Sequence, residues 1–174
     1  MDTLTSPLLA RPPRLGPDTA VTDLEVAALI ALATARGARV IAVGSGRTPA
    51  ALAASDAITH AWRAAGGTVA ATVTWPETAA SWLRQAQRFA EAPADLWVMT
   101  GPETGWAQMT RRLLWSTPWN PARTLATAAI GRQSALALVG ARHLPGLSGA
   151  GADGTSWTVA DDGQITVTDA GRPR

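Results

Sequence analysis

The residues best suited to bind a small molecule lie in three short turns, at residues 44–48, 75–78 and 101–104. Each turn combines small residues with polar side chains, and each precedes a segment that we expect to be helical. The N–H groups at a helix start attract carboxylate or phosphate, and the Arg47 guanidinium can bind either anion through two hydrogen bonds. The predicted ligand-binding residues are Ser45, Gly46, Arg47, Thr48, Trp75, Glu77, Gly101 and Glu103.

A second interpretation of these turns is purely structural. Gly44-Ser45-Gly46 does not complete the dinucleotide fingerprint Gly-x-Gly-x-x-Gly, because Pro49 holds the third glycine position, and the lysine of a P-loop is absent. Glu77 and Glu103 suit the first turn of a helix, where negative charge is stabilising. Trp75 favours the ligand-binding interpretation, because a Trp at a strand end can stack on an apolar or cationic ligand.

Few residues are suited to catalysis or metal binding. The chain has no Cys and only two His, which removes thiolate nucleophiles, Cys-ligated metals and multi-His metal sites. Ser45 is not the centre of a Gly-x-Ser-x-Gly motif, because Val43 stands two residues before it. His60 falls within an expected helix and His143 in a loop. We therefore predict no catalytic residue, no metal, no cofactor and no enzymatic activity.

The charge balance argues against nucleic-acid binding. The 15 basic residues are all Arg and the net charge is only +2, so the high isoelectric point of about 10.9 reflects the lack of Lys, Tyr and Cys. The arginines are scattered, and Arg111-Arg112 is the only adjacent pair. No apolar run reaches the roughly 18 residues of a membrane span. We expect neither a nucleic-acid partner nor a membrane span.

Helical and extended patterns alternate between residues 22 and 130. Thr22-x-x-Glu25 has the form of a capping box, followed by an expected helix to Arg36. Expected strands at 39–43, 68–74 and 95–100 are each followed by a turn and then a helix, the helices covering 48–65, 78–92 and about 103–114. A further strand is expected within 123–130. This order predicts an α/β sandwich with a mainly parallel sheet and helices on both faces.

The two ends of the chain have a different character. Residues 1–20 hold four prolines and little periodicity, and we interpret them as an extended lead-in. Residues 156–159 and 164–167 flank Asp161-Asp162-Gly163 and predict a C-terminal β-hairpin. Residues 21–170 are therefore expected to form a single α/β domain.

Three segments together resemble one lobe of a type I periplasmic binding protein, of the branched-chain amino-acid receptor type that serves ABC transporters. They are Val40-Ile41-Ala42-Val43, the run from Ala61 to Val69, and Ala94-Asp95-Leu96-Trp97-Val98. The run from Leu144 to Trp157 is similar to a late segment of such chains. The resemblance implies a non-catalytic lobe that binds an amino acid or a similar small polar molecule, with the three turns forming one wall of a cleft.

The chain departs from that family in length and at its start. It has material for one lobe only, so the resemblance implies a lone lobe, a remnant, or a lobe whose cleft is completed by a second lobe in another chain or by a homodimer. The first residues lack the pattern of a secretory signal, which favours the cytoplasm, whereas the resemblance favours export.

Two alternative functions remain open. Residues 43–48 together with 100–104 are similar to the phosphate-holding turns of a sugar-isomerase phosphosugar-binding domain. A structural role without a ligand is the other alternative, with Trp115 and Trp119 as a surface for a partner protein.

Overall fold

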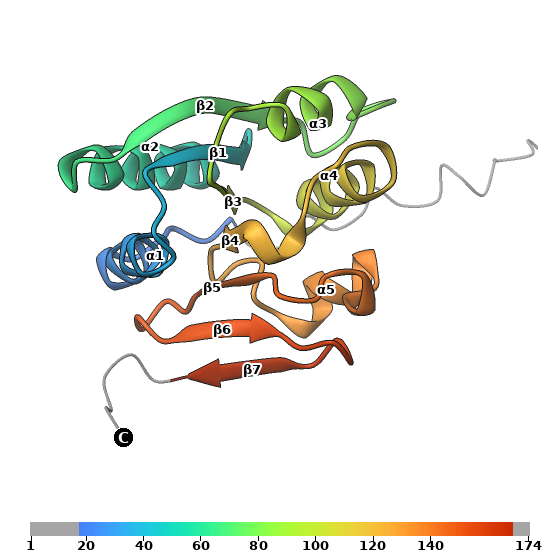
Figure 1. Ribbon diagram of the computed structural model, residues 1–174. Coiled ribbons are helices and arrows are strands. Elements are labelled where there is room, and N and C mark those ends of the chain that lie inside the picture. Colours follow the sequence, from blue (N-terminus) through green and yellow to red (C-terminus); the bar gives the residue numbers. More distant parts are fainter. Residues whose placement is uncertain (1–17, 169–174) are drawn as a thin grey trace, which may run out of the picture.

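The structure is a computed structural model that describes residues 18–168 (Figure 1). The predicted lead-in at residues 1–20 therefore lies almost entirely outside the described residues. The elements in chain order are α1 (Asp23–Ala35), β1 (Val40–Gly46), α2 (Pro49–Ala64), β2 (Thr68–Trp75), α3 (Leu83–Ala90), β3 (Leu96–Thr100), α4 (Glu103–Ser116), η2 (Pro121–Arg123), β4 (Thr124–Ala126), α5 (Gln133–Val139), η3 (Ala141–His143), β5 (Ser148–Ala150), β6 (Ser156–Val159) and β7 (Ile165–Thr168).

One seven-stranded sheet with the order β2-β1-β3-β4-β5-β6-β7 forms the centre of the molecule. Strands β1 to β5 are parallel, and β6 and β7 form an antiparallel hairpin at one edge. Helices α1 and α2 cover one face, and α3, α4 and α5 cover the other (Figure 1). The predicted three-layer α/β fold and the C-terminal hairpin are both confirmed.

Local sequence signals position the first helices as expected. Thr22 and Glu25 form a complete capping box at α1: Glu25 N donates to Thr22 Oγ1 at 3.1 Å, and Thr22 N donates to the Glu25 carboxylate at 3.4 Å. Thr48 caps α2, and Pro49 occupies its first helical position.

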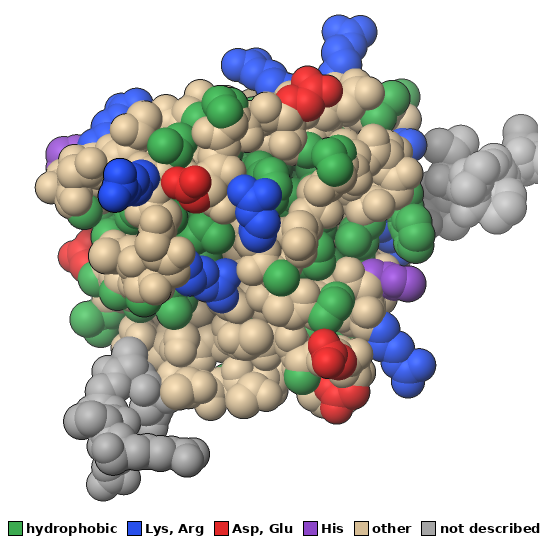
Figure 2. Space-filling model, viewed as in Figure 1, with side chains coloured by type: hydrophobic (Ala, Val, Ile, Leu, Met, Phe, Trp, Pro, Cys, Tyr) green, Lys and Arg blue, Asp and Glu red, His purple; other side chains and the backbone are tan. Residues whose placement is uncertain are grey.

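On the face that Figure 2 shows, acidic and arginine side chains are dispersed rather than gathered.

The predicted turn at Gly44-Ser45-Gly46 is wrong, because these residues are the last three of strand β1. Their glycines are required by side-chain packing above the strand. A Cβ added at Gly44 would lie 2.6 Å from Trp75 Cζ3 and 2.9 Å from Phe89 Cε2. Because Gly44 has no side chain, the rings of Trp75 and Phe89 can pack directly against the backbone of β1.

Trp75 is a core residue, so its predicted position on an accessible rim is wrong. Its side chain is 0% exposed and packs edge-to-face against Phe89, with ring centroids 6.5 Å apart. Trp75 alternates in phase with Val73, and both side chains point toward α3 and α4. The large apolar surface of Trp75 thus stabilises the fold and faces no solvent.

Three other expectations differ from the structure. Helix α3 starts at Leu83 instead of residue 78, since residues 76–82 form an irregular connection. Strand β5 and helix α5 were not predicted, because they have only three and seven residues. Trp119 is buried and only Trp115 is exposed, so the two do not form a common surface patch.

Replacing Trp75 and Trp115 by alanine tests this assignment. Trp75→Ala should lower the free energy of unfolding by ~3–5 kcal/mol, the usual effect of removing a buried aromatic side chain. Trp115→Ala should lower it by about 1 kcal/mol or less, because this side chain is 70% exposed and makes one ring contact, with His143. Urea unfolding of both variants measures the difference. Equal losses would contradict the core position of Trp75.

Candidate functional site

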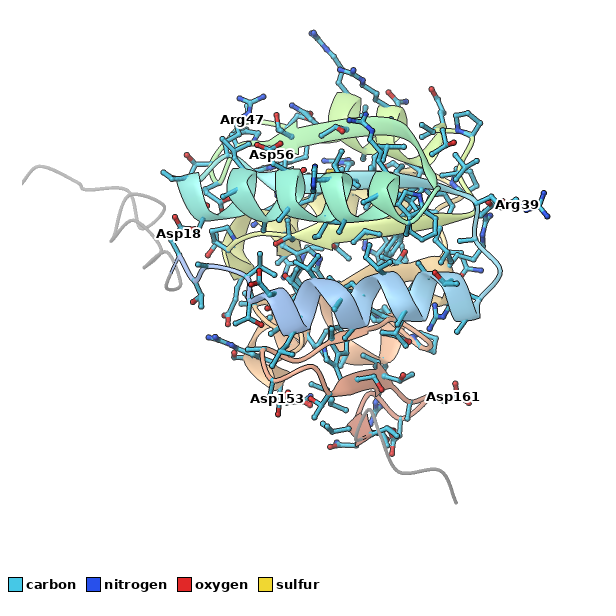
Figure 3. The ribbon with its side chains drawn as sticks, turned by 90° about the vertical axis from the view of Figure 1, so that its left-hand side faces the viewer. Asp18, Arg39, Arg47, Asp56, Asp153 and Asp161 are labelled. Carbon is cyan, nitrogen blue, oxygen red and sulfur yellow. The ribbon has the colours of Figure 1, made fainter. Side chains whose placement is uncertain are left out.

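The carboxyl ends of β1 and β3 lie at the topological switch point of the sheet. The chain leaves β1 toward β2 on one side and returns to β3 on the other, so the connections after β1 and β3 diverge. In open α/β sheets, ligands bind outside the carboxyl ends of the strands at such a point. Figure 3 shows Asp18, Arg47 and Asp153 at this end of the molecule, and Arg39 and Asp161 at the opposite end.

A row of hydroxyl groups crosses four strands at this edge. Ser45 of β1 is the register partner of Thr74 in β2 and of Thr100 in β3. Thr127, the residue after β4, continues the row, and its Oγ1 donates to Thr100 Oγ1 at 3.1 Å. Ser45 alternates in phase with Val43, which packs against α1 and α2, so the hydroxyls face those helices.

Ser45 holds a buried hydroxyl without a partner. The residue is 0% exposed, and its Oγ makes no hydrogen bond within the described part of the chain. A buried polar atom without a partner is costly. Among the predicted site residues, Ser45, Trp75 and Glu77 each have such an atom, and core residues such as Thr110 have one too.

Glu77 reaches over the end of β1 from the opposite face of the sheet. Its Oε2 accepts a hydrogen bond from Gly105 N at 2.9 Å in the first turn of α4, and its Oε1 is buried without a partner. A Cβ at Gly46 would lie 2.5 Å from Glu77 Oε1, and one at Gly105 would collide with Oε2. The two glycines thus leave the space that the carboxylate occupies.

Carboxylates of the protein already occupy N–H groups at two of the helix starts that were expected to bind an anionic ligand, and a third carboxylate bonds the connection after β4. Asp18 accepts from Thr48 Oγ1 at 2.6 Å and from Ala50 N at 3.2 Å at the start of α2. Glu77 occupies the start of α4. Glu25 accepts from Ala128 N at 2.6 Å in the connection after β4. An incoming anion would meet negative charge at each of these positions.

Two of these carboxyl groups have perturbed acidity. Burial raises the pKa of Glu77, the hydrogen bond from Gly105 N partly offsets this, and the charge of Asp18 raises the pKa further. Burial also raises the pKa of Glu25, against the opposing hydrogen bonds from the backbone of Ala128 and Thr22. Both groups therefore hold a proton more strongly than an exposed glutamate.

A cavity of about 60 Å³ opens at this edge between α1 and the connections after β3 and β4. A water molecule needs roughly 10–15 Å³ of such space, so the cavity accommodates a small polar group and not a whole metabolite. Its polar lining combines one acidic residue, three hydroxyls and one arginine: Glu25, Thr19, Thr100, Thr127 and Arg132. Arg132 extends from the N-cap position of α5, and its Nη1 lies 4.0 Å from Glu103 Oε1.

The structure brings together only some of the predicted site residues. Ser45, Gly46, Glu77 and Gly101 meet at the end of β1, where Gly101 has a φ of +132° and approaches Gly46 N closely. The remaining members lie elsewhere. Arg47 is exposed, and its Nε donates to Thr74 Oγ1 at 3.4 Å. Thr48 caps α2, and Glu103 faces α5, where it accepts from Ser134 Oγ at 3.2 Å.

Four residues of the site were not predicted from the sequence: Asp18, Glu25, Thr127 and Arg132. A fifth, Thr100, was considered only as part of the phosphosugar-type turn. Glu25 was interpreted as a capping residue only, and it also bonds a backbone 103 residues away. Threonine at the last position of a predicted strand was the available signal for Thr100. Among residues 18–168, no three His, Asp or Glu side chains are arranged to hold a metal ion. No helix in the same range is long and apolar enough to cross a membrane.

No protein-family model and no curated protein matches the sequence. Solved structures of ABC transporter solute-binding proteins do match the fold. A substrate-binding periplasmic protein from Ralstonia solanacearum is 15% identical, with a TM-score of 0.62 over 75% of this chain and 36% of its own. A branched-chain amino-acid ABC transporter periplasmic ligand-binding protein from Burkholderia xenovorans is 13% identical, with a TM-score of 0.58 over 72% of this chain and 33% of its own.

A third similar structure contains a ligand. The solute-binding protein of an ABC transporter from R. palustris, in complex with 4-hydroxybenzoate, is 17% identical, with a TM-score of 0.59 over 72% of this chain and 34% of its own. The chain thus spans about a third of the length of these proteins. Its fold is that of part of a lobe of a type I periplasmic binding protein, and the predicted resemblance is confirmed at the level of fold.

The raised pKa of Glu77 predicts a pH-dependent effect on stability. A carboxyl whose pKa is higher in the folded state binds its proton more strongly when folded, so its contribution to stability falls as pH rises from about 4.3, the ordinary Glu value, through the raised pKa. Glu77→Gln cannot ionise. Relative to the unmodified chain, this variant should gain stability progressively as pH increases across that range, which urea unfolding at a series of pH values measures.

Asp95→Asn is the matched control with the opposite sign. The backbone N–H groups of Arg39 and Val40 lower the pKa of Asp95, so ionised Asp95 stabilises the fold above about 3.9, the ordinary Asp value. Its variant should be less stable than the unmodified chain at neutral pH, and the difference should shrink as pH falls below that value. Parallel pH profiles for the two variants would refute the burial argument for Glu77.

Proposed function

We propose that the protein is a non-catalytic ligand-binding lobe that holds the polar end of an amino acid or a related small carboxylate at the carboxyl edge of its sheet. The observation that carries the proposal is the cavity in which Glu25, Thr100, Thr127 and Arg132 converge. It lies at the edge where α/β proteins bind ligands. The buried, unpaired hydroxyl of Ser45 on the neighbouring strand offers a further contact.

The chemistry of the lining fits a group that carries both charges. An α-ammonium group donates hydrogen bonds and matches the Glu25 carboxylate. A carboxylate accepts from the Arg132 guanidinium and from the Thr100 hydroxyl, which Thr127 Oγ1 orients by donating its own proton to it. This assignment replaces Arg47 by Arg132 as the arginine that binds the carboxylate. The helix starts retain their internal carboxylates and take no part.

A cavity of about 60 Å³ covers only one end of such a ligand. Ligand sites normally bury most of the surface of the molecule they bind, so we propose that a second lobe in another chain, or a second copy of this chain, covers the remainder. The matched solute-binding proteins are about three times as long as the part of them that this chain spans, which supports a missing wall. Their names describe periplasmic proteins, so we extend the proposal to binding outside the cytoplasm.

The phosphosugar alternative receives less support. It requires free N–H and hydroxyl donors at the start of α2, and there Asp18 already accepts from Thr48 Oγ1 and Ala50 N. A phosphate at this position would lie against a carboxylate. The ligand-free alternative retains Trp115 alone, because Trp119 is buried.

Calorimetric titration of the full chain with L-leucine and with 4-hydroxybenzoate tests the proposal. Thr127→Val should weaken binding about fivefold, because one hydrogen bond contributes about 1 kcal/mol. Arg132→Gln should weaken binding at least about tenfold, because a hydrogen bond to a charged group contributes about 1.5–3 kcal/mol.

Thr110→Val is the matched control. Thr110 is also buried, and its Oγ1 has no hydrogen-bond partner, but it lies in α4 among the core residues and not in the cavity. This variant should leave the affinity unchanged. If neither compound binds the unmodified chain, or if Thr127→Val and Arg132→Gln bind as it does, the proposal is wrong.

A further inference from the structure

Three arginines line one surface hollow outside the carboxyl-edge cavity. The hollow has a volume of about 380 Å³ and lies beside β2, the edge strand of the sheet. It is lined by Arg47, Arg84, Arg88, Gln85, Thr72, Val73 and Thr74. No residue is shared with the lining of the cavity between α1, β3 and β4. The two hollows are thus separate sites on the molecule.

Two elements direct these arginines to the same place. Arg84 and Arg88 are four residues apart in α3 and therefore lie on the same side of the helix. Arg47 follows β1, and its Nε donates to Thr74 Oγ1 at 3.4 Å, which directs the side chain across the end of β2. Thr72 and Thr74 alternate with Val73 and Trp75 along β2, so their side chains line the hollow from the face of the edge strand opposite to α3.

No acidic side chain lines the hollow beside its three arginines. Within residues 18–168, the one ion pair is that between Arg132 and Glu103, far from this edge of the sheet. Like charges one helical turn apart destabilise a helix, so Arg84 and Arg88 are held together at some loss of stability. An anion in the hollow would remove that loss.

We propose that this hollow binds a phosphate group. Guanidinium groups bind phosphate oxygens through paired hydrogen bonds, and the Gln85 amide supplies a further donor. A dianion gains more than a carboxylate from three guanidinium groups, because the Coulomb energy rises with the charge. The volume leaves space for the group to which the phosphate is attached, which can be a soluble metabolite or a lipid headgroup.

Titration of the full chain with inorganic phosphate at constant ionic strength, followed by calorimetry, tests the site. The double variant Arg84→Gln/Arg88→Gln should bind phosphate at least tenfold more weakly. Arg63→Gln/Arg142→Gln is the control with the same loss of charge, since neither guanidinium has a hydrogen-bond or ion-pair partner among the described residues and neither lines the hollow. Its affinity should change less than twofold.

A second arm distinguishes the two sources of phosphate. Phosphatidylcholine vesicles with and without phosphatidic acid are sedimented with each variant, and glycerol 3-phosphate is titrated in solution. Binding that depends on Arg84 and Arg88 supports the site in either arm, and the arm in which it is tighter identifies the source. If the unmodified chain binds phosphate no better than chloride, or if both double variants lose affinity equally, the proposal is overturned. Neither result affects the carboxyl-edge cavity, because Arg132 and Thr127 are unchanged.

Discussion

The end of strand β1 depends on a carboxylate that is taken out of water. Glu77 occupies the space above Gly46 and beside Gly105, and it accepts the hydrogen bond of Gly105 N at 2.9 Å. Any side chain at either glycine would displace it. The close approach of β1, the connection after β2 and the start of α4 therefore rests on two missing Cβ atoms and one buried acid. Two residues before Gly46, Gly44 leaves space in the same way for Trp75 and Phe89 to pack against the strand.

Internal acids also explain why the carboxyl edge differs from an open anion site. Asp18, Glu77 and Glu25 each accept backbone N–H groups at positions where α/β proteins often hold an anionic ligand. In the binding mode proposed above, the ligand is therefore contacted by side chains and not by backbone N–H groups. Hydroxyls from β1, β3 and the residue after β4 form a continuous row, and Arg132 supplies the positive charge. At edge strand β2, by contrast, three arginines line a hollow that has no acidic lining residue.

Much of the fold could be predicted from the sequence, because its signals are local. The capping box at Thr22, the Thr48-Pro49 start of α2 and the apolar run before Gly44 each act over a few residues. The site could be predicted only in part. Ser45 was identified, but the contact of Asp18 with Thr48 spans 30 residues and that of Glu25 with Ala128 spans 103. Trp75 was assigned to the rim because a strand end predicts accessibility, and only the position of α3 shows that the ring is covered.

The position of a strand in the sheet also determines how readily its backbone hydrogen bonds open. Strand β1 has a partner on both sides and is buried along six of its seven residues. Strand β7 has a partner on one side only, and three of its four residues are exposed. Backbone hydrogen bonds open most readily where few apolar contacts hold them. Amide hydrogens of the hairpin should therefore exchange with solvent through small local openings, whereas those of β1 should exchange much more slowly.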